Sequence, residues 1–230
     1  MFLTETHLHT AEGSACASAS GAEQADQYKE LGYDTIIITD HFINGNTAVD
    51  RSLPWDKQMD SYCSGYEHAK ERGEEIGLNV LFGIEYSWDA ADFLMYGIDK
   101  AWLKSNPDML SVSVHEICDR VHAAGGIVVQ AHPFREADYI RDIKLLPWHC
   151  DGVEIFNAGN RDPAYDQRAI WYAEQFGFVP TAGSDCHHVT DSGRFYGVET
   201  EFEIKTIEDY IKAVKERQIK GLYVPGFCGR

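Results

Sequence analysis

The stretch DTIIITDH at residues 34–41 decides the fold class of this chain. Residues 22–31 before it have a helical pattern, which Gly32 ends. The apolar run at residues 35–39 is typical of a buried strand, and it leads directly into Asp40-His41. A helix that feeds a buried strand predicts a parallel β/α unit with polar side chains at its carboxyl end.

The same unit recurs along the chain about seven times. Helical patterns at residues 57–76, 111–124 and 163–176 alternate with short apolar runs. Each run adjoins residues of metal-binding or catalytic type: residues 80–84 precede Glu85, residues 127–131 precede His132, residues 152–156 precede Asn157, residues 178–182 lead into Gly183-Ser184-Asp185-Cys186-His187, and Asp92 opens the run at 93–97.

This alternation predicts an α/β fold with a mainly parallel sheet. A closed barrel makes the carboxyl ends of its strands converge, whereas an open doubly wound sheet spreads them along one edge. No glycine-rich phosphate loop follows the first strand, which further disfavours a nucleotide-binding sheet. We therefore expect a TIM-like barrel in a single domain over residues 1–230, since no Gly/Ser-rich or Pro-rich linker divides the chain.

Composition and charge narrow the class of protein. The formal net charge is -17 and the acidic residues are spread along the chain, so nucleic acid is an unfavourable partner. The apolar runs are too short to span a bilayer and the first residues lack a signal-peptide pattern, so we expect a cytoplasmic protein. The cysteines form no CxxC pair, which favours reduced thiols; they are Cys16, Cys63, Cys118, Cys150, Cys186 and Cys228.

Two pairs of potential ligands are spaced two residues apart. In the first strand, His7 and His9 would project side by side on one face. Asp185 and His187 repeat that spacing near the other end of the chain. Each of these residues, taken alone, also fits a surface role. Their shared position at strand ends favours a metal site.

The donor types indicate which ions would bind. His, Asp and Glu without paired cysteines suit zinc, manganese or iron. More than four such donors suggest several ions, and a carboxylate such as Glu85 can bridge two of them. Clustered divalent ions are a common means of hydrolysing phosphate esters.

Five motifs in order resemble those of the PHP (polymerase and histidinol phosphatase) superfamily. They are His7-Leu8-His9-Thr10, Ile38-Thr39-Asp40-His41, Gly83-Ile84-Glu85, Ala131-His132-Pro133 and Gly183-Ser184-Asp185-Cys186-His187, and they span residues 6–188. The resemblance implies a distorted (β/α)7 barrel with two or three metal ions that hydrolyses phosphate esters. It also implies ligand sets: His7, His9, Glu85 and Asp185 for a first ion, His41 and His187 for a second that Glu85 bridges, and His132 for a third.

Two positions depart from the family pattern. The family usually has an acidic residue or histidine shortly after the first motif, where this chain has Ser14 with Glu12 just before it, and we choose Glu12. Where the family often has histidine before the strand at 93–97, this chain has Asp92, which can also bind zinc or manganese. His115 is the alternative donor, but its helical context favours a structural role.

Other residues are assigned supporting roles. Asp40 is expected to orient a histidine ligand. Arg135 and Arg194 could clamp a phosphate by bidentate hydrogen bonds, although surface salt bridges explain them equally well. Cys186 should point away from the ligands on either side of it. The candidate catalytic residues, which touch the expected ions and substrate, are His41, Asp185 and His187.

The sequence therefore predicts a metal-dependent phosphoesterase that acts on a small phosphorylated substrate, such as histidinol phosphate or a nucleotide. One alternative is a metal-dependent amide or ring hydrolase, but such enzymes usually need a carbamylated lysine, and no lysine ends an obvious core strand. A second alternative is a metal-binding regulatory module that has lost catalysis. The exact substrate, the native metal and the oligomeric state stay open.

Overall fold

Strand β2 (Thr35–Ile38) shows how the barrel is built, because its two faces meet different partners. Ile36 and Ile38 pack in an outer cluster with side chains of helices α1 (Gly21–Glu30) and α3 (Ser64–Ile76), whereas Ile37 packs on the inner face against helix α7 (Ile207–Lys215). This follows from the alternation of side chains along a strand. A strand buried on both faces accounts for the uninterrupted apolar run.

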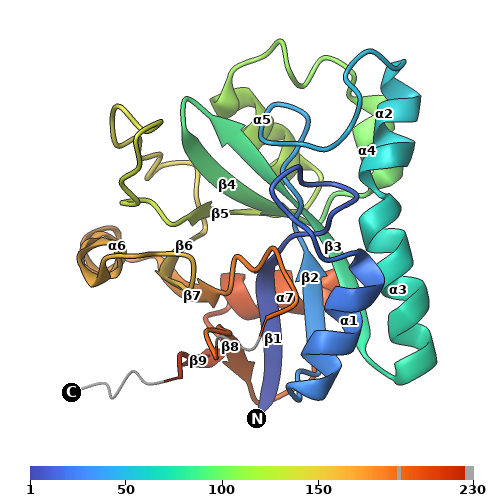
Figure 1. The fold of residues 1–230 in the computed structure, drawn as a ribbon. Coiled ribbons are helices and arrows are strands. Elements are labelled where there is room, and N and C mark those ends of the chain that lie inside the picture. Colours follow the sequence, from blue (N-terminus) through green and yellow to red (C-terminus); the bar gives the residue numbers. More distant parts are fainter. Residues whose placement is uncertain (191–192, 226–230) are drawn as a thin grey trace.

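The computed structural model describes residues 1–190 and 193–225 (Figure 1). Helices and strands alternate over most of this length. In chain order the elements are β1 (Phe2–Leu8), α1 (Gly21–Glu30), β2, α2 (Trp55–Tyr62), α3 (Ser64–Ile76), β3 (Asn79–Trp88), β4 (Ala91–Tyr96), α4 (Lys100–Ser105), α5 (Val114–Ala123), β5 (Ile127–Ala131), β6 (Gly152–Asn157), α6 (Pro163–Phe176), β7 (Val179–Gly183), β8 (Gly197–Thr200), α7 (Ile207–Lys215) and β9 (Ile219–Tyr223).

The strands form one sheet that curls into a nearly closed barrel. Its order is β7-β6-β5-β4-β3-β2-β1-β8-β9. Parallel pairing joins β1, β2 and β3, and again β5, β6 and β7. The segment after β7 returns to β1: the Asp185 amide donates to the His7 carbonyl at 2.8 Å, and the His9 amide donates to the Cys186 carbonyl at 3.1 Å. The predicted α/β barrel is confirmed.

Strand β4 departs from the expected parallel pattern. It runs antiparallel to both β3 and β5, and a tight turn at Asp89 and Ala90, both with positive φ, joins it to β3. Because β4 is reversed, its beginning lies at the edge where the parallel strands end. That reversal brings Asp92, at the start of β4, to the same end of the barrel as Glu85.

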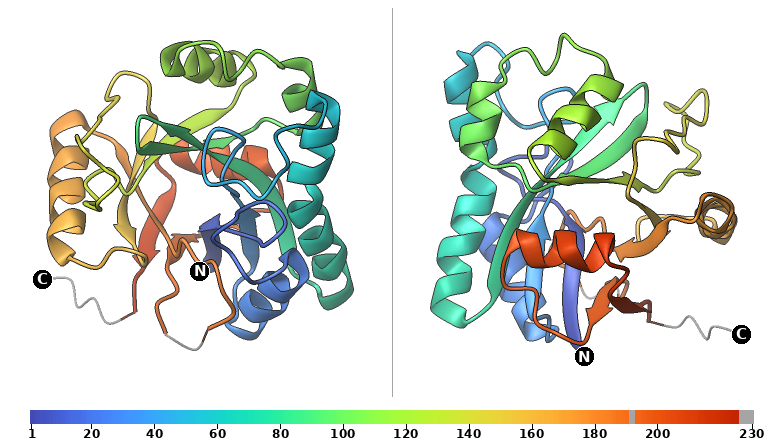
Figure 2. Two further views of the ribbon diagram at one scale, coloured as in Figure 1. Left: turned by 45° about the horizontal axis from the view of Figure 1, so that its top comes forward. Right: turned by 180° about the vertical axis from the view of Figure 1, so that it is seen from behind.

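Helices pack on the outside of the barrel and at one of its ends. Helices α1 and α3 lie side by side along β1 and β2, and α6 covers β6 and β7 on the other side of the barrel (Figure 1). Helix α7 crosses the strands in the view from behind (Figure 2) and packs against inner-face residues such as Ile37, Leu94 and Val129. Because Gly97, just after the end of antiparallel β4, lies against Ile211 of α7, this helix fills the barrel end opposite the polar residues.

The inner face therefore changes character along the barrel. On β3, Leu81 packs in the apolar cluster with α7, and Glu85, four residues later on the same face, lies among histidines. The five described cysteines are all free, and Cys228 lies outside the described residues. In the part of the chain that the structure describes, no helix is long and apolar enough to cross a membrane.

Candidate metal centre

The predicted donors converge at one end of the barrel, although they come from six strands or the loops that follow them. Glu85 is fully buried and stands in the middle of this group. Its Oε1 lies 3.1 Å from His7 Nε2 and 3.3 Å from His132 Nε2, and its Oε2 lies 2.5 Å from His41 Nδ1 and 3.6 Å from His9 Nε2. Its two oxygens thus face different histidines, as a bridging carboxylate must.

Asp185 forms a second point of convergence. Its Oδ1 lies 3.1 Å from His9 Nε2 and 3.5 Å from His7 Nε2, and its Oδ2 accepts a hydrogen bond from Arg135 at 2.8 Å. Both Asp185 and His132 have positive φ, at 52° and 27°. Non-glycine residues rarely adopt this backbone region, and such strain is concentrated at functional sites.

The donor atoms fall into three overlapping groups. Within each group, the ligand atoms lie within 4.8 Å of one another. The groups are His7, His9 and Asp185; His7, Glu85 and His132; and His9, His41 and His187. Asp92 stands at the edge, with its Oδ2 3.9 Å from His132 Nε2. The geometry brings together every predicted donor except Glu12.

Several buried donor atoms of this cluster face one another directly. Nε2 of His7 and Nε2 of His9 lie 3.1 Å apart. Glu85 Oε2 and His41 Nδ1 lie 2.5 Å apart, and neither has a further hydrogen-bond partner among the described residues. Donor atoms packed this closely fit a site that receives divalent ions.

The electrostatics favour the ligand forms of three central residues. Burial, together with the nearby His187 and His41, holds the pKa of His9 well below its usual range, so His9 is a neutral donor. Burial alone would raise the pKa of the Glu85 and Asp185 carboxyls, but neighbouring cationic groups, led by His41 for Glu85 and by His7 for Asp185, lower it well below the ordinary values.

Two histidines hold protons that a metal would displace. Burial opposes the charged form of His41, but the Glu85 carboxylate raises its pKa to about 11. The pKa of His7 is likewise raised, against burial, by the carboxylates of Glu154, Asp185 and Glu85. A metal ion competes with these protons for the same nitrogens, so binding releases them.

Buried partners fix the orientation of the histidine ligands. His7 Nδ1 lies 3.0 Å from Oε1 of Glu154, a buried residue of β6 whose Oε2 also accepts from the His132 amide at 3.0 Å. His9 Nδ1 lies 2.9 Å from Ser14 Oγ, which donates to Asp40 Oδ1 at 2.7 Å. Asp40 thus orients a ligand through Ser14. Glu154 was missed, and its only signal is a charged residue inside an apolar strand.

Glu12 is a correction to the sequence-based choice. Its Oε1 lies 2.9 Å from His68 Nδ1, and its carboxylate accepts from the Gly21 amide at the start of α1. These contacts turn Glu12 away from the cluster. The alternative donor His115 lies in α5, where its ring is 4.7 Å from that of His149, and Cys186 Sγ points away to the His188 carbonyl at 3.1 Å.

Cys16 is a second residue that the sequence did not indicate. It lies in the loop after β1 and lines the same cavity as His41 and His187. Burial works to raise the pKa of its thiol, but these two histidines lower it to about 6. Its position near two candidate ligands comes from the path of the loop, which has no periodic pattern to predict it.

A cavity of about 1090 Å³ opens above the donor cluster. Arg135 lies on its wall, where it donates to Asp185, Asn157 and Asn160. Arg194 also lines it and donates to the Asn160 carbonyl at 2.7 Å. Arg161 is a third lining arginine, exposed and not foreseen from the sequence. The two predicted arginines therefore reach the same cavity.

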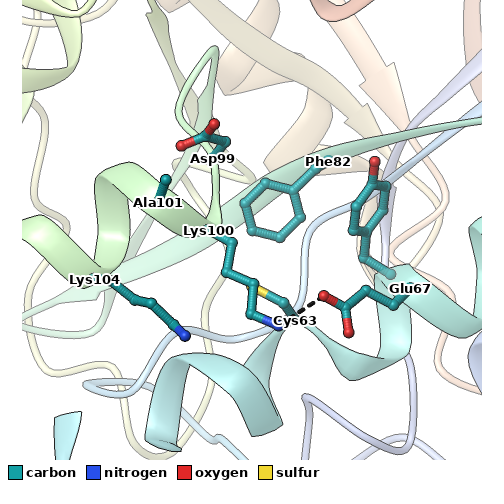
Figure 3. Close-up of a pocket in the computed structure, with 8 residues that line it drawn as sticks. Cys63, Glu67, Phe82, Asp99, Lys100, Ala101 and Lys104 are labelled. Atoms are coloured by element: carbon teal, nitrogen blue, oxygen red, sulfur yellow. Dashed lines mark hydrogen bonds and ion pairs between the residues drawn. The ribbon is translucent and has the colours of Figure 1, made fainter. Parts of the chain in front are cut away.

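A smaller cavity of about 450 Å³ lies on the outside of the barrel between α3, α4 and β3 (Figure 3). Lys100 lines it and pairs with Glu67 at 2.7 Å, and Lys104 pairs with Asp60 at 2.6 Å. Its wall holds no histidine among the described residues. The potential ligands thus belong to the barrel-end cavity.

Comparisons with known proteins agree with this architecture. A family model described as PHP-associated matches residues 164–219. An uncharacterized protein of Methanocaldococcus jannaschii is 26% identical over 107 residues, which cover 43% of this chain and 45% of that protein. The chain therefore spans less than half the length of this curated relative.

Solved structures with the same fold are more distant in sequence. A two-domain protein of Bacteroides vulgatus, which contains a "predicted PHP-like metal-dependent phosphoesterase", has a TM-score of 0.66 at 14% identity, covering 97% of this chain and 64% of that one. An amidohydrolase of Chromobacterium violaceum, solved with bound sulfate and no metal, has a TM-score of 0.59 at 14% identity, covering 97% and 98%. The resemblance to the PHP superfamily that the motifs predict is confirmed.

Proposed function

We propose that this chain, which shares the fold and motifs of the PHP superfamily, is a metal-dependent hydrolase that acts on phosphate esters. The observation that carries the proposal is the single cluster of His7, His9, His41, Glu85, His132, Asp185 and His187, in which His41, His132, Asp185 and His187 line the cavity and the other three are fully buried. A metal-dependent hydrolase also agrees with the names of the structural neighbours. That the substrates are phosphate esters is the second part of the proposal.

The three donor groups support an assignment of residues to individual ions. His7, His9 and Asp185 would hold one ion, His7 or Glu85 with His132 another, and His41 with His187 a third. Divalent ions supply a nucleophilic hydroxide near neutral pH and neutralise charge that develops on phosphate oxygens. Zinc, manganese and iron all suit histidine and carboxylate donors.

The chain's own residues bind and orient the substrate. Arg135 is held by Asp185, Asn157 and Asn160, so its guanidinium is fixed beside the donor cluster. A fixed guanidinium offers the fork geometry that matches phosphate oxygens. His41 and His187 line the cavity and would serve as ligands, so the proton that a leaving alkoxide needs would come from water that enters the cavity.

The cavity chemistry favours phosphate over a carbonyl substrate. The amidohydrolase alternative usually requires a carbamylated lysine, and no lysine is among the described residues that line the cavity. Three arginines line it instead. A volume of about 1090 Å³ accommodates a small metabolite or a nucleotide. A small phosphomonoester is therefore the proposed substrate.

Metal analysis combined with a substrate panel tests the proposal. Purified protein is dialysed with zinc, manganese or iron, its metal content is measured, and hydrolysis of sugar, amino-alcohol, nucleotide and aryl phosphates is compared with that of amides and lactones. We expect two or three ions per chain and phosphate release that His7→Ala and Asp185→Ala each reduce by at least about 100-fold. Glu67→Gln, in the outer cavity, is the matched control and should change the rate little.

Three outcomes would reject the proposal. Phosphate hydrolysis that survives both substitutions would separate the activity from this cluster. Turnover of amides or lactones without phosphate release would favour the amidohydrolase alternative. A fully loaded centre that hydrolyses nothing in the panel would favour the regulatory module.

A further inference from the structure

Asn160 lies in the loop after β6 and contacts two of the arginines that line the cavity. Its side-chain Oδ1 accepts a hydrogen bond from Arg135 Nε at 3.0 Å, and its backbone carbonyl accepts one from Arg194 Nη2 at 2.7 Å. Arg135 follows β5 and Arg194 follows β7, so these contacts join segments that are distant in sequence. One residue, only 7% exposed, therefore connects both guanidinium groups.

The Asn160 side chain has one fixed orientation. Its Nδ2 donates to Asp166 Oδ1 at 2.7 Å, in the first turn of α6, and its backbone amide donates to the Asn157 carbonyl at 3.0 Å. A guanidinium can only donate, so the amide oxygen must face Arg135 and the amino group must face Asp166. Both ends of the side-chain amide are therefore in use, and β6 and α6 support the residue from two sides.

The hydrogen bonds of Arg135 leave one of its nitrogens for a ligand. Nε donates to Asn160, and Nη2 donates to Asn157 Oδ1 at 2.6 Å and to Asp185 Oδ2 at 2.8 Å. These bonds use three of the five N–H groups of the guanidinium. Among the described residues, Nη1 has no hydrogen-bond partner, and Arg135 lines the cavity. The N–H groups on Nη1 can therefore donate to an anion.

The cationic wall of the cavity lies on the side of Asn160. The described arginines that line the cavity come from the loops after β5, β6 and β7, and they are Arg135, Arg161 and Arg194. Apart from candidate ligands, the lining residues after β2 and at the end of β3 are uncharged, namely Asn44, Asn46 and Ser87. Anionic oxygens are attracted to the cationic side, where Asn160 holds two of the three arginines.

We propose that Asn160 is a positioning residue that holds Arg135 and Arg194 as one clamp for the anionic oxygens of the substrate, outside the metal cluster. This inference rests on the proposed function, because the clamp serves the same substrate. Nη1 of Arg135 and the guanidinium of Arg194 donate to the anion. Side chains that are already held in place lose less conformational entropy when they bind, so the clamp binds an anion more tightly than two mobile arginines would.

Asn160→Ala tests the clamp by separating binding from chemistry. The substitution removes the Oδ1 acceptor of Arg135 and the contact with Asp166 but leaves every metal donor in place. We expect two values to rise about 10-fold: the KM for a phosphate ester, and the Kd for inorganic phosphate measured by isothermal titration calorimetry on the metal-loaded protein. The kcat should change by less than about threefold, and the metal content should equal that of the wild type. Asn106→Ala is the matched control, since it removes a side-chain hydrogen bond to the Trp102 carbonyl outside the cavity, and it should change none of these values.

Two double variants show whether Asn160 acts through its hydrogen bonds. Asn160→Asp keeps an acceptor for Arg135 but sets two carboxyl groups against each other, and adding Asp166→Asn restores a donor at unchanged net charge. This double variant should return the Kd for phosphate to within about threefold of the wild-type value, whereas Asn160→Asp alone should not. Arg135→Lys keeps the charge beside Asp185 but lacks the Nε–H group. In that background, Asn160→Ala should weaken phosphate binding by less than about threefold, because the donor that Asn160 holds is absent.

The outcomes separate this inference from the proposed function. Phosphate release with unchanged KM and Kd in Asn160→Ala would overturn the clamp and leave the phosphoesterase standing. Equal losses of kcat and metal content, or a full effect of Asn160→Ala in the Arg135→Lys background, would do the same, because they would mark a purely structural role. Phosphate binding that depends on Asn160, in a protein that hydrolyses no phosphate ester, would support the clamp and reject the phosphoesterase. A metal-loaded protein that neither binds nor releases phosphate would overturn both.

Discussion

Glu85 is the residue on which the cluster depends, since its two oxygens face four histidines. Glu85→Gln keeps the shape of the side chain but replaces one oxygen by an amide nitrogen, which cannot bind a cation. It also removes the charge that holds His41 protonated or metal-bound. We expect Glu85→Gln to lose at least one ion per chain after dialysis and to lower kcat/KM by more than about 100-fold, measured by metal analysis and phosphate release.

Glu12→Gln is the matched control for this prediction. The sequence also predicts Glu12 as a ligand, at a position that departs from the family pattern, but its carboxylate contacts His68 and Gly21 instead of the cluster. The metal content of Glu12→Gln should equal that of the wild type, and its kcat/KM should lie within about threefold of the wild-type value. The reverse result, in which Glu12→Gln loses an ion and Glu85→Gln does not, would show that the arrangement of the cluster is wrong.

The contrast between these glutamates shows which site residues a sequence can reveal. His7, His9 and Glu85 lie on strands, where a period of two fixes the direction of each side chain. Glu12 and Cys16 lie in a loop whose path is set by hydrogen bonds to segments distant in sequence, such as Asn46 and His187. No local pattern encodes those bonds, so the direction of the Glu12 side chain could not be predicted from the sequence.

At the scale of elements, the seam between β1 and β7 closes the barrel. Glu5 lies on the same face of β1 as His7, and its carboxylate accepts from the Ser184 amide at 3.0 Å and from the Ser184 hydroxyl. It is fully buried, and this burial raises its pKa to about 7 in spite of the hydrogen bonds. The seam therefore contains a carboxyl that titrates near neutral pH.

Glu5 should make the stability of the metal-free protein depend on pH. Its ordinary pKa is 4.5 and its folded value is about 7, so between these values the folded state binds more protons than the unfolded state. The stabilising contribution of the protonated carboxyl is complete below pH about 4.5 and is lost as the pH rises through about 7, on the order of 3 kcal/mol. Glu5→Gln should remove this slope, measured by urea unfolding in the presence of chelator at several pH values.

The difference between variant and wild type isolates Glu5 from other titrating groups. Glu71→Gln, on the exposed surface of α3, should leave the pH dependence of the unfolding free energy unchanged. Parallel pH profiles for the wild type and Glu5→Gln would mean that Glu5 stays ionised in the folded protein.

Most elements follow directly from sequence pattern, and the exceptions have physical causes. Strand β5 and helix α6 have the predicted bounds because apolar periodicity and clear stop signals coincide there. The direction of β4 was not predicted: the turn before it uses Asp89 and Ala90 with positive φ, without the Asn-Gly or Asp-Gly signal of a hairpin. The predicted helix over 57–76 is two helices, α2 and α3, that meet at Cys63.

At the scale of the whole molecule, the proposed centre joins parts of the chain that are far apart in sequence. The donors extend from β1 to the segment after β7, and they meet where the seam of the barrel closes. The formal net charge of -17 adds repulsion that bound cations offset. Unfolding would separate the donors, so ions that bind the folded state stabilise the entire barrel.

Metal removal should therefore lower the melting temperature of the whole chain. An ion present at 100 times its Kd stabilises by about 2.7 kcal/mol, and each kcal/mol shifts the Tm of a chain of this size by about 2–4 °C. We expect a chelator to lower the Tm, measured by differential scanning calorimetry, by about 5–10 °C for each ion removed. The Tm should recover when zinc is restored. Glu12→Gln should show the same drop, whereas Glu85→Gln should show a smaller one because it holds fewer ions. An equal drop in both variants would mean that the stabilising ions bind elsewhere on the acidic surface, because only ions in the cluster depend on Glu85.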